Sequence, residues 1–344
     1  TKMKALALLS GGLDSTLAIK VVLDQDIEVE AVNCFTPFCQ CSGKKGCGHE
    51  AKRATDGLGV RLKIFNISTE YIEVIKAPRH GYGKNINPCI DCRILMLRKA
   101  KEYMKETGSS FIITGEVLGQ RPMSQHKAAL RIIERESGLE GLILRPLSAK
   151  LFPPSIPEKE GWIDRKRLLE ISGRSRKPQM ALAAKYGIAD YPCPAGGCLL
   201  TDPGFTRRMK DLLKHCEITL NDIQLLKLGR HFRLRSQAKL IVGRNKEENE
   251  TLLGLAKRDD ICFRPVDVVG PIGIGRGNFD QNTITLASRI MARYSDGISD
   301  DNVSPVKGLD PEGVKIAIED LASRKKDIII VKGISDSQLE VFRI

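Results

Sequence analysis

The first third of the chain alternates short apolar runs with segments whose apolar positions recur at helical spacing. Residues 4–9 form a short, mainly apolar run that is typical of a buried strand. The next segment, 15–23, spaces its apolar residues as a helix does. The alternation continues, with strands predicted at 28–32, 61–67 and 111–114 and helices at 50–58 and 92–105. Strands that alternate with helices predict an α/β fold with a doubly wound parallel sheet.

A proline-rich stretch interrupts this alternation in the middle of the chain. Residues 151–157 contain three prolines and predict an irregular loop or a linker. Helical composition returns at 165–171 and at 178–186. The segment that follows, 191–198, is too rich in Pro and Gly for a regular element.

The sequence changes character after Asp202, and we place a domain boundary there, between 1–202 and 203–344. The second segment contains basic strands that lead into a helix, followed by a Gly-rich turn at 270–277. A further helix is expected at 282–293 and an apolar strand at 328–331. These elements predict a smaller α+β C-terminal domain.

Composition and charge narrow the class of protein. The chain has 344 residues, of which 42% are hydrophobic, and no apolar run reaches the length of a membrane span. The signature of a signal peptide is absent, so we expect a cytoplasmic protein with no membrane partner. The net charge of +13 favours a polyanionic partner, because contacts from Lys and Arg to phosphate supply most nucleic-acid affinity.

Residues 10–16, Ser-Gly-Gly-Leu-Asp-Ser-Thr, join the first strand to the first helix and give the most specific chemical signal. Glycines let a backbone approach phosphate closely, and the amides of a helix N-terminus favour negative charge. The hydroxyls of Ser10, Ser15 and Thr16 add donors, and Asp14 can hold the loop or a Mg²⁺ ion. This segment predicts a nucleotide site in preference to an ordinary Gly-rich turn.

The string resembles the phosphate loop of the PP-loop ATP pyrophosphatase superfamily, whose domains have an adenine nucleotide alpha hydrolase-like fold. Members cleave ATP between the α- and β-phosphates, adenylate a substrate and release pyrophosphate. The resemblance implies that Gly11 and Gly12, with the neighbouring hydroxyls, bind the pyrophosphate part of ATP. Thr114 and Gly115, at the end of the 111–114 strand, resemble a further loop that lies against the nucleotide.

The chain has ten cysteines, which predict metal ligands, catalytic thiols or small buried side chains rather than disulfides. Cys89 and Cys92 form a C-x-x-C motif that follows Pro88 and precedes a predicted helix. Two thiols at this spacing can face one centre, and a helix N-terminus is expected to lower their pKa values. Cys193 and Cys198 form a second close pair much further along the chain.

Together with the nucleotide loop, the motif resembles the tRNA thiouridylases of the same superfamily, which replace an ATP-activated carbonyl oxygen with sulfur. Cys92 and Cys198 match the two catalytic cysteines of bacterial-type members. Cys89, Cys92 and Cys198 match the three cysteines of members that bind an iron–sulfur cluster. The resemblance implies a catalytic set of Cys89, Cys92, Cys198 and Asp14. Residues 145–147, Arg-Pro-Leu, resemble an element of the cluster-bearing enzymes.

Three uses of these thiols are compatible with the sequence. Three thiolates can hold a [4Fe–4S] cluster and leave its fourth iron open for a substrate sulfide. The same thiols can carry a persulfide, with one attacking and one resolving sulfur. Zn²⁺ is the third alternative, with Cys193 as the fourth ligand.

A second zinc site is also compatible with the sequence near the end of the 28–32 strand. Cys and His are suitable zinc ligands, but the spacing is irregular, and incidental thiols or redox pairs explain the same residues equally well. The candidate ligands are Cys39, Cys41, Cys47 and His49.

Basic side chains crowd the beginning of the second domain. His231 and Phe232 interleave with arginines, a pattern that suits phosphate contact and base stacking. The stretch resembles the NFACT-type RNA-binding module, and the alternative is a solvated basic face. The predicted RNA-binding residues are Arg207, Arg208, Arg230, Arg233, Arg235, Lys239 and Arg244.

The leading hypothesis is an ATP-dependent tRNA sulfurtransferase that uses ATP, Mg²⁺ and a [4Fe–4S] cluster or a persulfide. Its partners would be tRNA and a sulfur donor, which is a cysteine desulfurase, free sulfide or a carrier, and a homodimer is left open. One alternative keeps the ATP chemistry but forms an amide or a nitrile on a small molecule beside structural Zn²⁺. The other is a non-catalytic RNA-binding adaptor.

Overall fold

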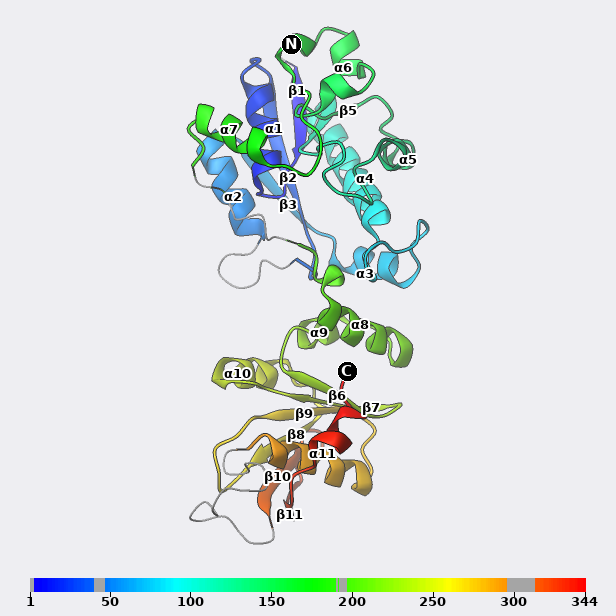
Figure 1. Ribbon diagram of the computed structural model, residues 1–344, viewed down its shortest axis with the longest axis vertical. Coiled ribbons are helices and arrows are strands. Elements are labelled where there is room, and N and C mark those ends of the chain that lie inside the picture. The colour runs from blue at the N-terminus through cyan, green and yellow to red at the C-terminus, as the bar shows by residue number, and fades with distance from the viewer. Residues whose placement is uncertain (1–2, 40–46, 190, 192–196, 296–312) are drawn as a thin grey trace. The chain divides into compact units, whose positions relative to one another are not determined.

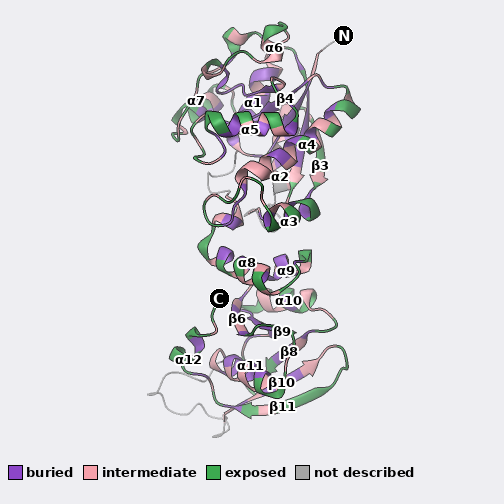
Figure 2. Cartoon of the chain, turned by 90° about the vertical axis from the view of Figure 1, so that its right-hand side faces the viewer, coloured by how far each residue is buried: buried purple, intermediate pink, exposed green. Residues whose placement is uncertain are grey.

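The computed structural model describes residues 3–39, 47–189, 191, 197–295 and 313–344, without the side chain of Cys47. The chain divides into two compact units, Thr1–Asp202 and Pro203–Ile344, and both are drawn in Figures 1 and 2. None of the helices in the described ranges combines the length and the hydropathy that a bilayer-spanning segment needs.

The first unit is built on a parallel sheet with the strand order β3-β2-β1-β4-β5. Its strands are β1 (Lys4–Leu8), β2 (Glu28–Phe35), β3 (Arg61–Asn66), β4 (Phe111–Thr114) and β5 (Ile143–Leu144). The central strand β1 pairs with both β2 and β4, so that Ala5 lies opposite Val29 and Phe111. The carboxyl ends of the parallel strands therefore meet at one edge. The predicted doubly wound parallel sheet is confirmed.

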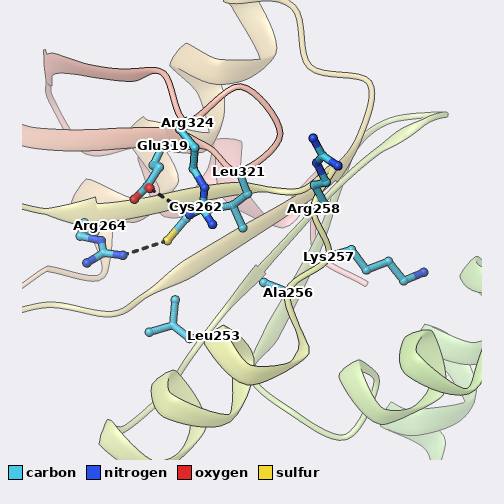
Figure 3. Close-up of a pocket in the computed structure, with 9 residues that line it drawn as sticks. All are labelled: Leu253, Ala256, Lys257, Arg258, Cys262, Arg264, Glu319, Leu321 and Arg324. Atoms are coloured by element: carbon cyan, nitrogen blue, oxygen red, sulfur yellow. Dashed lines mark hydrogen bonds and ion pairs between the residues drawn. The ribbon is translucent and has the colours of Figure 1, made fainter.

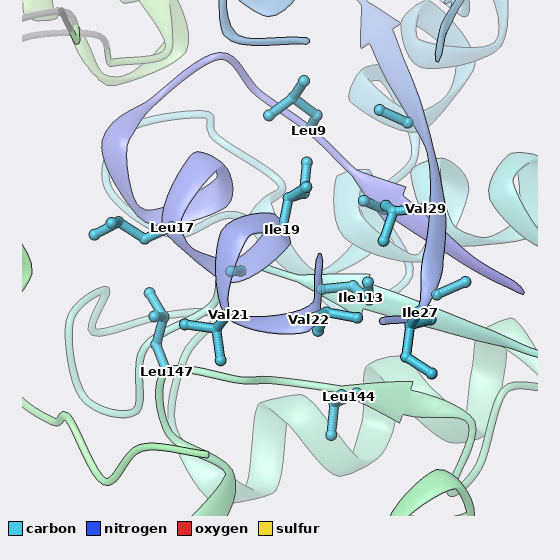
Figure 4. Close-up of a cluster of buried hydrophobic side chains, with 14 of the residues drawn as sticks. Leu9, Leu17, Ile19, Val21, Val22, Ile27, Val29, Ile113, Leu144 and Leu147 are labelled. Carbon is cyan, nitrogen blue, oxygen red and sulfur yellow. The ribbon is translucent and has the colours of Figure 1, made fainter. Parts of the chain in front are cut away.

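Helices cover both faces of this sheet. They are α1 (Leu13–Leu23), α2 (Cys47–Leu58), α3 (Ser68–Lys76), α4 (Cys89–Thr107), α5 (Lys127–Ser137), α6 (Ile156–Lys159) and α7 (Lys177–Lys185). Side chains alternate along β1, with Ala5 and Ala7 in the layer that contains α1 and α7, and Leu6 and Leu8 in the layer that contains α4 and α5. Figure 4 shows α1 packed against β2 and β4 in the first layer. Burial on both faces explains the mainly apolar sequence of β1.

Residues 165–171 do not form the predicted helix. Only Arg165–Arg167 makes a 3₁₀ turn (η3), and the chain then runs beside the segment that follows β5. The Leu169 N–H donates to the Pro146 carbonyl at 2.9 Å, and the Ile171 N–H donates to the Leu147 carbonyl at 2.8 Å. Pairing with a distant backbone segment thus replaces helical hydrogen bonds here.

The second unit is built on a separate antiparallel sheet with the order β11-β10-β8-β9-β7-β6. Its strands are β6 (Arg230–Arg235), β7 (Ala238–Val242), β8 (Ile261–Pro265), β9 (Gly273–Gly277), β10 (Val314–Asp320) and β11 (Lys326–Val331). Its helices are α8 (Pro203–His215), α9 (Leu220–Leu225), α10 (Lys246–Leu255), α11 (Gln281–Arg293) and α12 (Asp336–Glu340). The predicted α+β class of this unit is confirmed.

Two apolar layers lie on opposite faces of this sheet. Helix α11 packs over Phe232, Leu240 and Phe263, whereas Leu252 of α10 packs with Ile241 on the other face. The Gly-rich segment at 270–277 is not only a turn, because it contains strand β9 between β7 and β8. A Cβ atom on Gly275 would lie 2.9 Å from Phe263 Cε2, so the glycine lets an aromatic ring pack directly on the strand.

Candidate functional site

The 10–16 loop lies at the carboxyl end of β1, directly before α1. Gly11 has a φ of +79°, and a Cβ atom on it would lie 2.6 Å from the backbone nitrogen of Ala51, so only glycine fits. The Ser15 hydroxyl donates to the Gly12 carbonyl at 2.9 Å, and the Ser10 N–H donates to Ser15 Oγ at 3.3 Å. Within the described residues no side chain caps the N-terminus of α1. Its positive end is therefore available to an anion.

The end of β4 closes on this loop. A Cβ atom on Gly115 would lie 2.4 Å from the backbone nitrogen of Ser15, so a glycine is needed where the two segments meet. Asp14 Oδ2 accepts from Gln120 Nε2 at 3.0 Å. The other carboxylate oxygen of Asp14 is buried and has no hydrogen-bond partner among the described residues. Because buried oxygens normally have a partner, this one is suited to a cation or to a donor on a ligand.

Three of the predicted ATP-binding hydroxyls, those of Ser15, Thr16 and Thr114, are buried and donate to partners inside the protein. Thr16 Oγ1 donates to the Gly12 carbonyl at 3.1 Å, and Thr114 Oγ1 donates to Glu116 Oε2 at 3.1 Å. Both threonines are buried, whereas Ser10 is exposed. The threonines therefore brace the loop and the end of β4, and Ser10 is the hydroxyl that faces solvent.

A buried carboxylate joins the end of β4 to helix α4. Glu116 Oε2 accepts from Arg145 Nε at 3.0 Å, and its Oε1 lies 3.0 Å from Arg93 Nε. Arg145 also pairs with Glu134 of α5. Burial alone would raise the pKa of Glu116, but the guanidinium groups of Arg93 and Arg145 outweigh burial and lower it below the ordinary value of 4.5. Glu116 is thus ionised at neutral pH and holds the residue that follows Cys92.

Three of the predicted cysteines come together from two distant segments. Cys89 and Cys92 lie in the first turn of α4, where the Cys92 N–H donates to the Pro88 carbonyl at 2.8 Å. Cys198 precedes the 3₁₀ turn η4 (Leu199–Thr201). A charge on Cys89 or Cys92 raises the pKa of the Cys198 thiol, so the three sulfurs lie within electrostatic reach of one another. We refer to Cys89, Cys92 and Cys198 as the thiol group.

Hydrogen bonds hold the segment of Cys198 against earlier parts of the chain. The Leu199 N–H donates to the Phe38 carbonyl at 2.8 Å, directly after β2. The Thr201 carbonyl accepts from Asn85 Nδ2 at 2.8 Å, shortly before α4. These contacts place the third cysteine beside the first turn of α4.

Tyr71 of α3 is a site residue that no sequence motif reveals. Its side chain is 1% exposed, and its ring packs edge-to-face on Phe38 with 5.5 Å between centroids. Burial raises the pKa of Tyr71 well above 10, so its hydroxyl stays protonated, and the interaction of this hydroxyl with Cys92 lowers the pKa of that thiol. Cys34, at the end of β2, is a further thiol near this group, and a charge on Cys92 raises its pKa. The only sequence signal for Tyr71 was its place on the apolar face of a helix.

The thiol group is protonated in these surroundings. Burial raises the pKa of Cys92 to about 11 and that of Cys198 to about 12, and it also raises the pKa of Cys89. The guanidinium groups of Arg93 and Arg121 act in the opposite direction. The predicted lowering of these pKa values by the helix N-terminus is wrong, because burial outweighs it. Thiolates here require a metal, or a base or cation that arrives with the substrate.

The structure describes only some of the residues that were predicted to bind a metal. Within those ranges no three His, Cys, Asp or Glu side chains are arranged as ligands of one metal ion. The prediction of thiols rather than disulfides is wrong at Cys39, which is disulfide-bonded and therefore is not a thiolate ligand for Zn²⁺. His49 is exposed on α2. Cys41, Cys193 and the side chain of Cys47 lie outside the described residues, so both zinc sites stay predictions.

In the second unit, several predicted RNA-binding side chains are held by carboxylates of the same unit. Arg233 Nε and Nη2 donate to Asp211 at 3.0 and 2.6 Å. Lys239 Nζ lies 3.4 Å from the same carboxylate, and burial lowers its pKa to about 8. Arg244 pairs with Glu248 one helical turn away. These side chains stabilise the unit and have less charge to offer to RNA.

The remaining predicted RNA-binding residues differ in their surroundings. Arg235 Nη1 lies 2.7 Å from Asp280 Oδ2. The Arg230 guanidinium lies 4.5 Å from the centroid of the Tyr294 ring. Arg208 Nε donates to the Gly204 carbonyl at 3.2 Å, and Arg207 is exposed on α8.

Each unit contains a segment that matches a known family model. Residues 1–150 match the family model of the thiamine biosynthesis protein (ThiI), and residues 229–343 match that of the NFACT protein RNA binding domain. The chain is 27% identical over 147 residues to the probable tRNA sulfurtransferase of Thermococcus kodakarensis, which covers 43% of this chain and 37% of that protein. It is 33% identical over 122 residues to the probable tRNA sulfurtransferase of Anoxybacillus flavithermus, which covers 35% of this chain and 30% of that protein. The chain therefore spans about a third of the length of these curated relatives.

Among solved structures, the chain is similar to a 4-thiouridine synthetase–RNA complex with bound ATP, with a TM-score of 0.37 and 23% identity over 65% of this chain and 52% of that chain. It is also similar to the U34-tRNA thiolase NcsA from Methanococcus maripaludis with its [4Fe–4S] cluster, with a TM-score of 0.31 and 16% identity over 63% of this chain and 75% of that chain. The family matches confirm the resemblances drawn from the sequence. The chain is thus similar to the thiamine biosynthesis protein (ThiI) family over residues 1–150 and to the NFACT protein RNA binding domain over residues 229–343.

Proposed function

We propose that the protein is an ATP-dependent tRNA sulfurtransferase. The observation that carries this proposal is the position of the thiol group at the same edge of the parallel sheet as the 10–16 loop. Glu116 joins the two, because it pairs with Arg93 beside Cys92 and directly follows Gly115, which meets Ser15. Ligands of doubly wound sheets bind at this edge. An anion site beside a group of thiols is what adenylation followed by sulfur transfer requires.

In this proposal the 10–16 loop binds the pyrophosphate part of ATP. The N-terminus of α1 and the backbone of Gly11 and Gly12 provide the positive end of a helix and a close approach. Ser10 adds an exposed hydroxyl. The unpartnered carboxylate oxygen of Asp14 fits a Mg²⁺ ion, which would neutralise phosphate charge. The main contribution of the loop is to position the α-phosphate for attack.

The first chemical step is adenylation of a uridine in tRNA. The carbonyl oxygen of the base attacks the α-phosphorus, the bond from that phosphorus to the bridging oxygen breaks, and pyrophosphate leaves. A sulfur nucleophile then forms a bond to the activated carbon, and the carbon–oxygen bond breaks with AMP as the leaving group. Adenylation is needed because an unactivated carbonyl oxygen is a poor leaving group.

The thiol group can deliver sulfur as a relay. A persulfide on one cysteine attacks the activated carbon, and a second cysteine thiolate then attacks the cysteine sulfur of the resulting mixed disulfide. The thiouridine is released, and a disulfide forms between the two cysteines. A cellular dithiol reductant supplies the two electrons that restore both thiols.

The thiol group also fits three ligands of a [4Fe–4S] cluster, which supplies an open iron for a sulfide when it is bound. The fit rests on three half-buried cysteines from two segments, with Arg93 and Arg121 close enough to lower the pKa of Cys92. Guanidinium groups at that range balance the negative charge of a cluster. A single Zn²⁺ ion with Cys193 as the fourth ligand stays the third alternative, because Cys193 lies outside the described residues.

The test is formation of thiouridine in unmodified tRNA by the full chain with ATP and Mg²⁺, measured by mass spectrometry of nucleosides. Sulfide is supplied in one arm, and a cysteine desulfurase with cysteine and a dithiol reductant in the other, because only the second arm delivers sulfur at the oxidation level of a persulfide. We expect Cys198→Ala to reduce the rate at least about 100-fold while the affinity for ATP is unchanged. Cys216→Ala is the matched control, because Cys216 is an exposed thiol of the second unit. Wild-type thiolation by the Cys198→Ala variant would refute the assignment.

Two measurements separate the remaining alternatives. Release of pyrophosphate should depend on tRNA, whereas an enzyme that acts on a small molecule would not show this dependence and an adaptor would release none. Anaerobic absorbance, with assays for iron and acid-labile sulfide, distinguishes the cluster from the persulfide relay. Iron in the wild type that is lost in Cys89→Ala would assign the cluster.

A further inference from the structure

The second unit contains a pocket of about 520 Å³ that the sequence patterns did not indicate. It opens between the end of α10, strand β8 and the turn after β10, as Figure 3 shows. Its volume lies within the range of about 300–1,000 Å³ that small-ligand sites occupy. Its charged lining consists of Lys257, Arg258, Arg264, Arg324 and the carboxylate of Glu319.

The pocket keeps a net positive charge after its ion pairs are considered. Arg324 Nη1 lies 3.5 Å from Glu319 Oε1, and Lys257 Nζ lies 3.8 Å from Asp222 Oδ1. Arg264 Nη2 lies 3.5 Å from Cys262 Sγ, and neither Arg264 nor Arg258 has a carboxylate within 4.0 Å in the described part of the chain. Both arginines are exposed. They therefore differ from Arg233, whose charge is matched by Asp211 at 2.6 Å.

The pocket adjoins an exposed aliphatic surface. Arg264 of β8 pairs with Ala317 of β10, which pairs with Ile328 of β11, so these three side chains share one face of the sheet. On this face Ile328 is 60% exposed and Ile330 is 39% exposed. Large exposed aliphatic side chains beside charged ones are a feature of interaction sites.

We propose that this pocket binds a phosphate group of RNA and that the adjoining sugar or base lies against the aliphatic side chains of β11. Guanidinium groups bind phosphate through two parallel hydrogen bonds and stack on bases, which suits Arg258 and Arg264. The inference rests on the proposed tRNA substrate and adds the surface on which the second unit contacts it. It replaces Arg233, Lys239 and Arg244 as the main phosphate contacts, because Arg233 and Lys239 already share the carboxylate of Asp211 and Arg244 is paired with Glu248.

The first test measures tRNA affinity of the full chain by fluorescence anisotropy at several salt concentrations between about 50 and 200 mM. The double substitution Arg258→Ala with Arg264→Ala should weaken binding at least about tenfold and reduce the slope of log K against log salt by about 1 to 2. Lys246→Ala is the matched control. It also removes a positive charge from the second unit, and its side chain is 92% exposed and lies outside the pocket, 4.0 Å from Glu250. Wild-type affinity and slope in the double variant would overturn the inference. An unchanged circular dichroism spectrum checks that the exposed substitutions leave the fold intact.

The second test reports on each arginine separately. Phenylglyoxal modification followed by mass spectrometry should show that tRNA protects Arg258, Arg264 and Arg324, while Arg131 of the first unit stays reactive. Protection by ATP alone, without RNA, would mean that the pocket is a nucleotide site and would overturn the assignment to RNA.

The footprint also separates this inference from the proposed function. Thiolation of tRNA without protection of the pocket arginines would refute the inference and leave the proposed function standing. Protection without any thiouridine product would support the inference and refute the proposed function. Absence of RNA binding by the wild type would refute both.

Discussion

Glu116 Oε1 lies 3.0 Å from Arg93 Nε, so a buried carboxylate at the end of β4 is paired with the first turn of helix α4. Arg93 directly follows Cys92, and Glu116 directly follows Gly115, which meets the backbone of Ser15. One ion pair thus connects the helix of the thiol group to the 10–16 loop. The next predictions test how far the stability and the binding sites of the first unit depend on this connection.

Replacing Glu116 with Gln should destabilise the protein by about 3 to 5 kcal/mol, because the buried Arg145 and the half-buried Arg93 lose the carboxylate that lies between them, and Glu134 is left to pair with Arg145 alone. Urea unfolding followed by circular dichroism measures the change. Asp56→Asn is the control, since Asp56 and Lys52 form an ion pair in which both side chains are mostly exposed, and its loss should change stability by less than about 1 kcal/mol. Equal stability of Glu116→Gln and the wild type would contradict the role of this carboxylate.

The stabilisation from Glu116 should depend on pH with a definite sign. Its pKa in the folded protein lies below the ordinary value of 4.5, so the unfolded state binds the proton more readily. The stabilisation is therefore complete above pH 4.5 and is lost as the pH falls through the folded pKa. The difference in unfolding free energy between the wild type and Glu116→Gln should shrink on acidification. A difference that stays constant would show that Glu116 is not ionised in the folded protein.

Gly115→Ala should abolish ATP binding or weaken it at least about tenfold. The added methyl group would lie 2.4 Å from the Ser15 nitrogen, and a backbone atom cannot move away as a flexible side chain can. Isothermal titration with ATP and Mg²⁺ measures the effect. Gly57→Ala on α2 is the matched control, because its Cβ atom would enter open space, and it should stabilise the helix by about 0.5 to 1 kcal/mol without changing the affinity. Wild-type affinity in Gly115→Ala would show that this contact does not shape the nucleotide site.

The metal-free thiol group should react slowly with iodoacetamide at neutral pH. Burial raises the pKa of Cys92 to about 11, so only a small fraction is thiolate at pH 8, and the rate should rise about tenfold per pH unit up to that pKa. The free thiol of Cys216 is exposed and should react first. Mass spectrometry of peptides after timed alkylation gives the rate for each cysteine. Faster alkylation of Cys92 than of Cys216 at pH 7 would contradict the burial argument.

The loss of the proton from Lys239 should raise the free energy of unfolding of the second unit as the pH rises above 8. Burial lowers its pKa in the folded protein to about 8 from an ordinary value of 10.5, so the unfolded state binds more protons between these values. Stability should therefore rise in this window by up to about 1.4 kcal/mol per pH unit, and Lys239→Met should lack the rise. Urea unfolding of the full-length wild type and of Lys239→Met at several pH values gives the difference between their unfolding free energies. The contributions of the other titrating groups are the same in both proteins and cancel in this difference. Parallel pH profiles would show that Lys239 keeps its proton in the folded protein.

The sequence predicted best what depends on neighbouring residues. The run at 4–9, the 10–16 loop and the following helix form one continuous unit, and glycines at 11 and 12 have a local reason to be there. Strand β9 was interpreted as a turn because its glycines are poor strand formers. Its stability comes from pairing with β7 and β8 and from the packing of Phe263 on Gly275, which no local pattern shows.

The site residues that belong to a short sequence motif were predictable. The residues that enter the site through packing of distant elements were not. The C-x-x-C spacing indicated Cys89 and Cys92, but Tyr71 enters the site only because α3 packs beside α4. The thiol pKa values follow from burial, which sequence spacing does not give. The density of arginines near 230 was a misleading guide to free charge, since Asp211 and Glu248 neutralise Arg233 and Arg244.

The route by which Cys198 joins Cys89 and Cys92 has a consequence for the order of folding. The hydrogen bond from the Leu199 N–H to the Phe38 carbonyl can form only after the ribosome has synthesised the whole segment from α4 to α7. Closing so long a loop costs entropy that short-range contacts do not, so it follows the formation of the local elements. A chain that has emerged from the ribosome only as far as α5 has two sulfurs, and the third is added last. If the proposed function is correct, loading of the thiol group with sulfur or metal reports whether the first unit has finished folding.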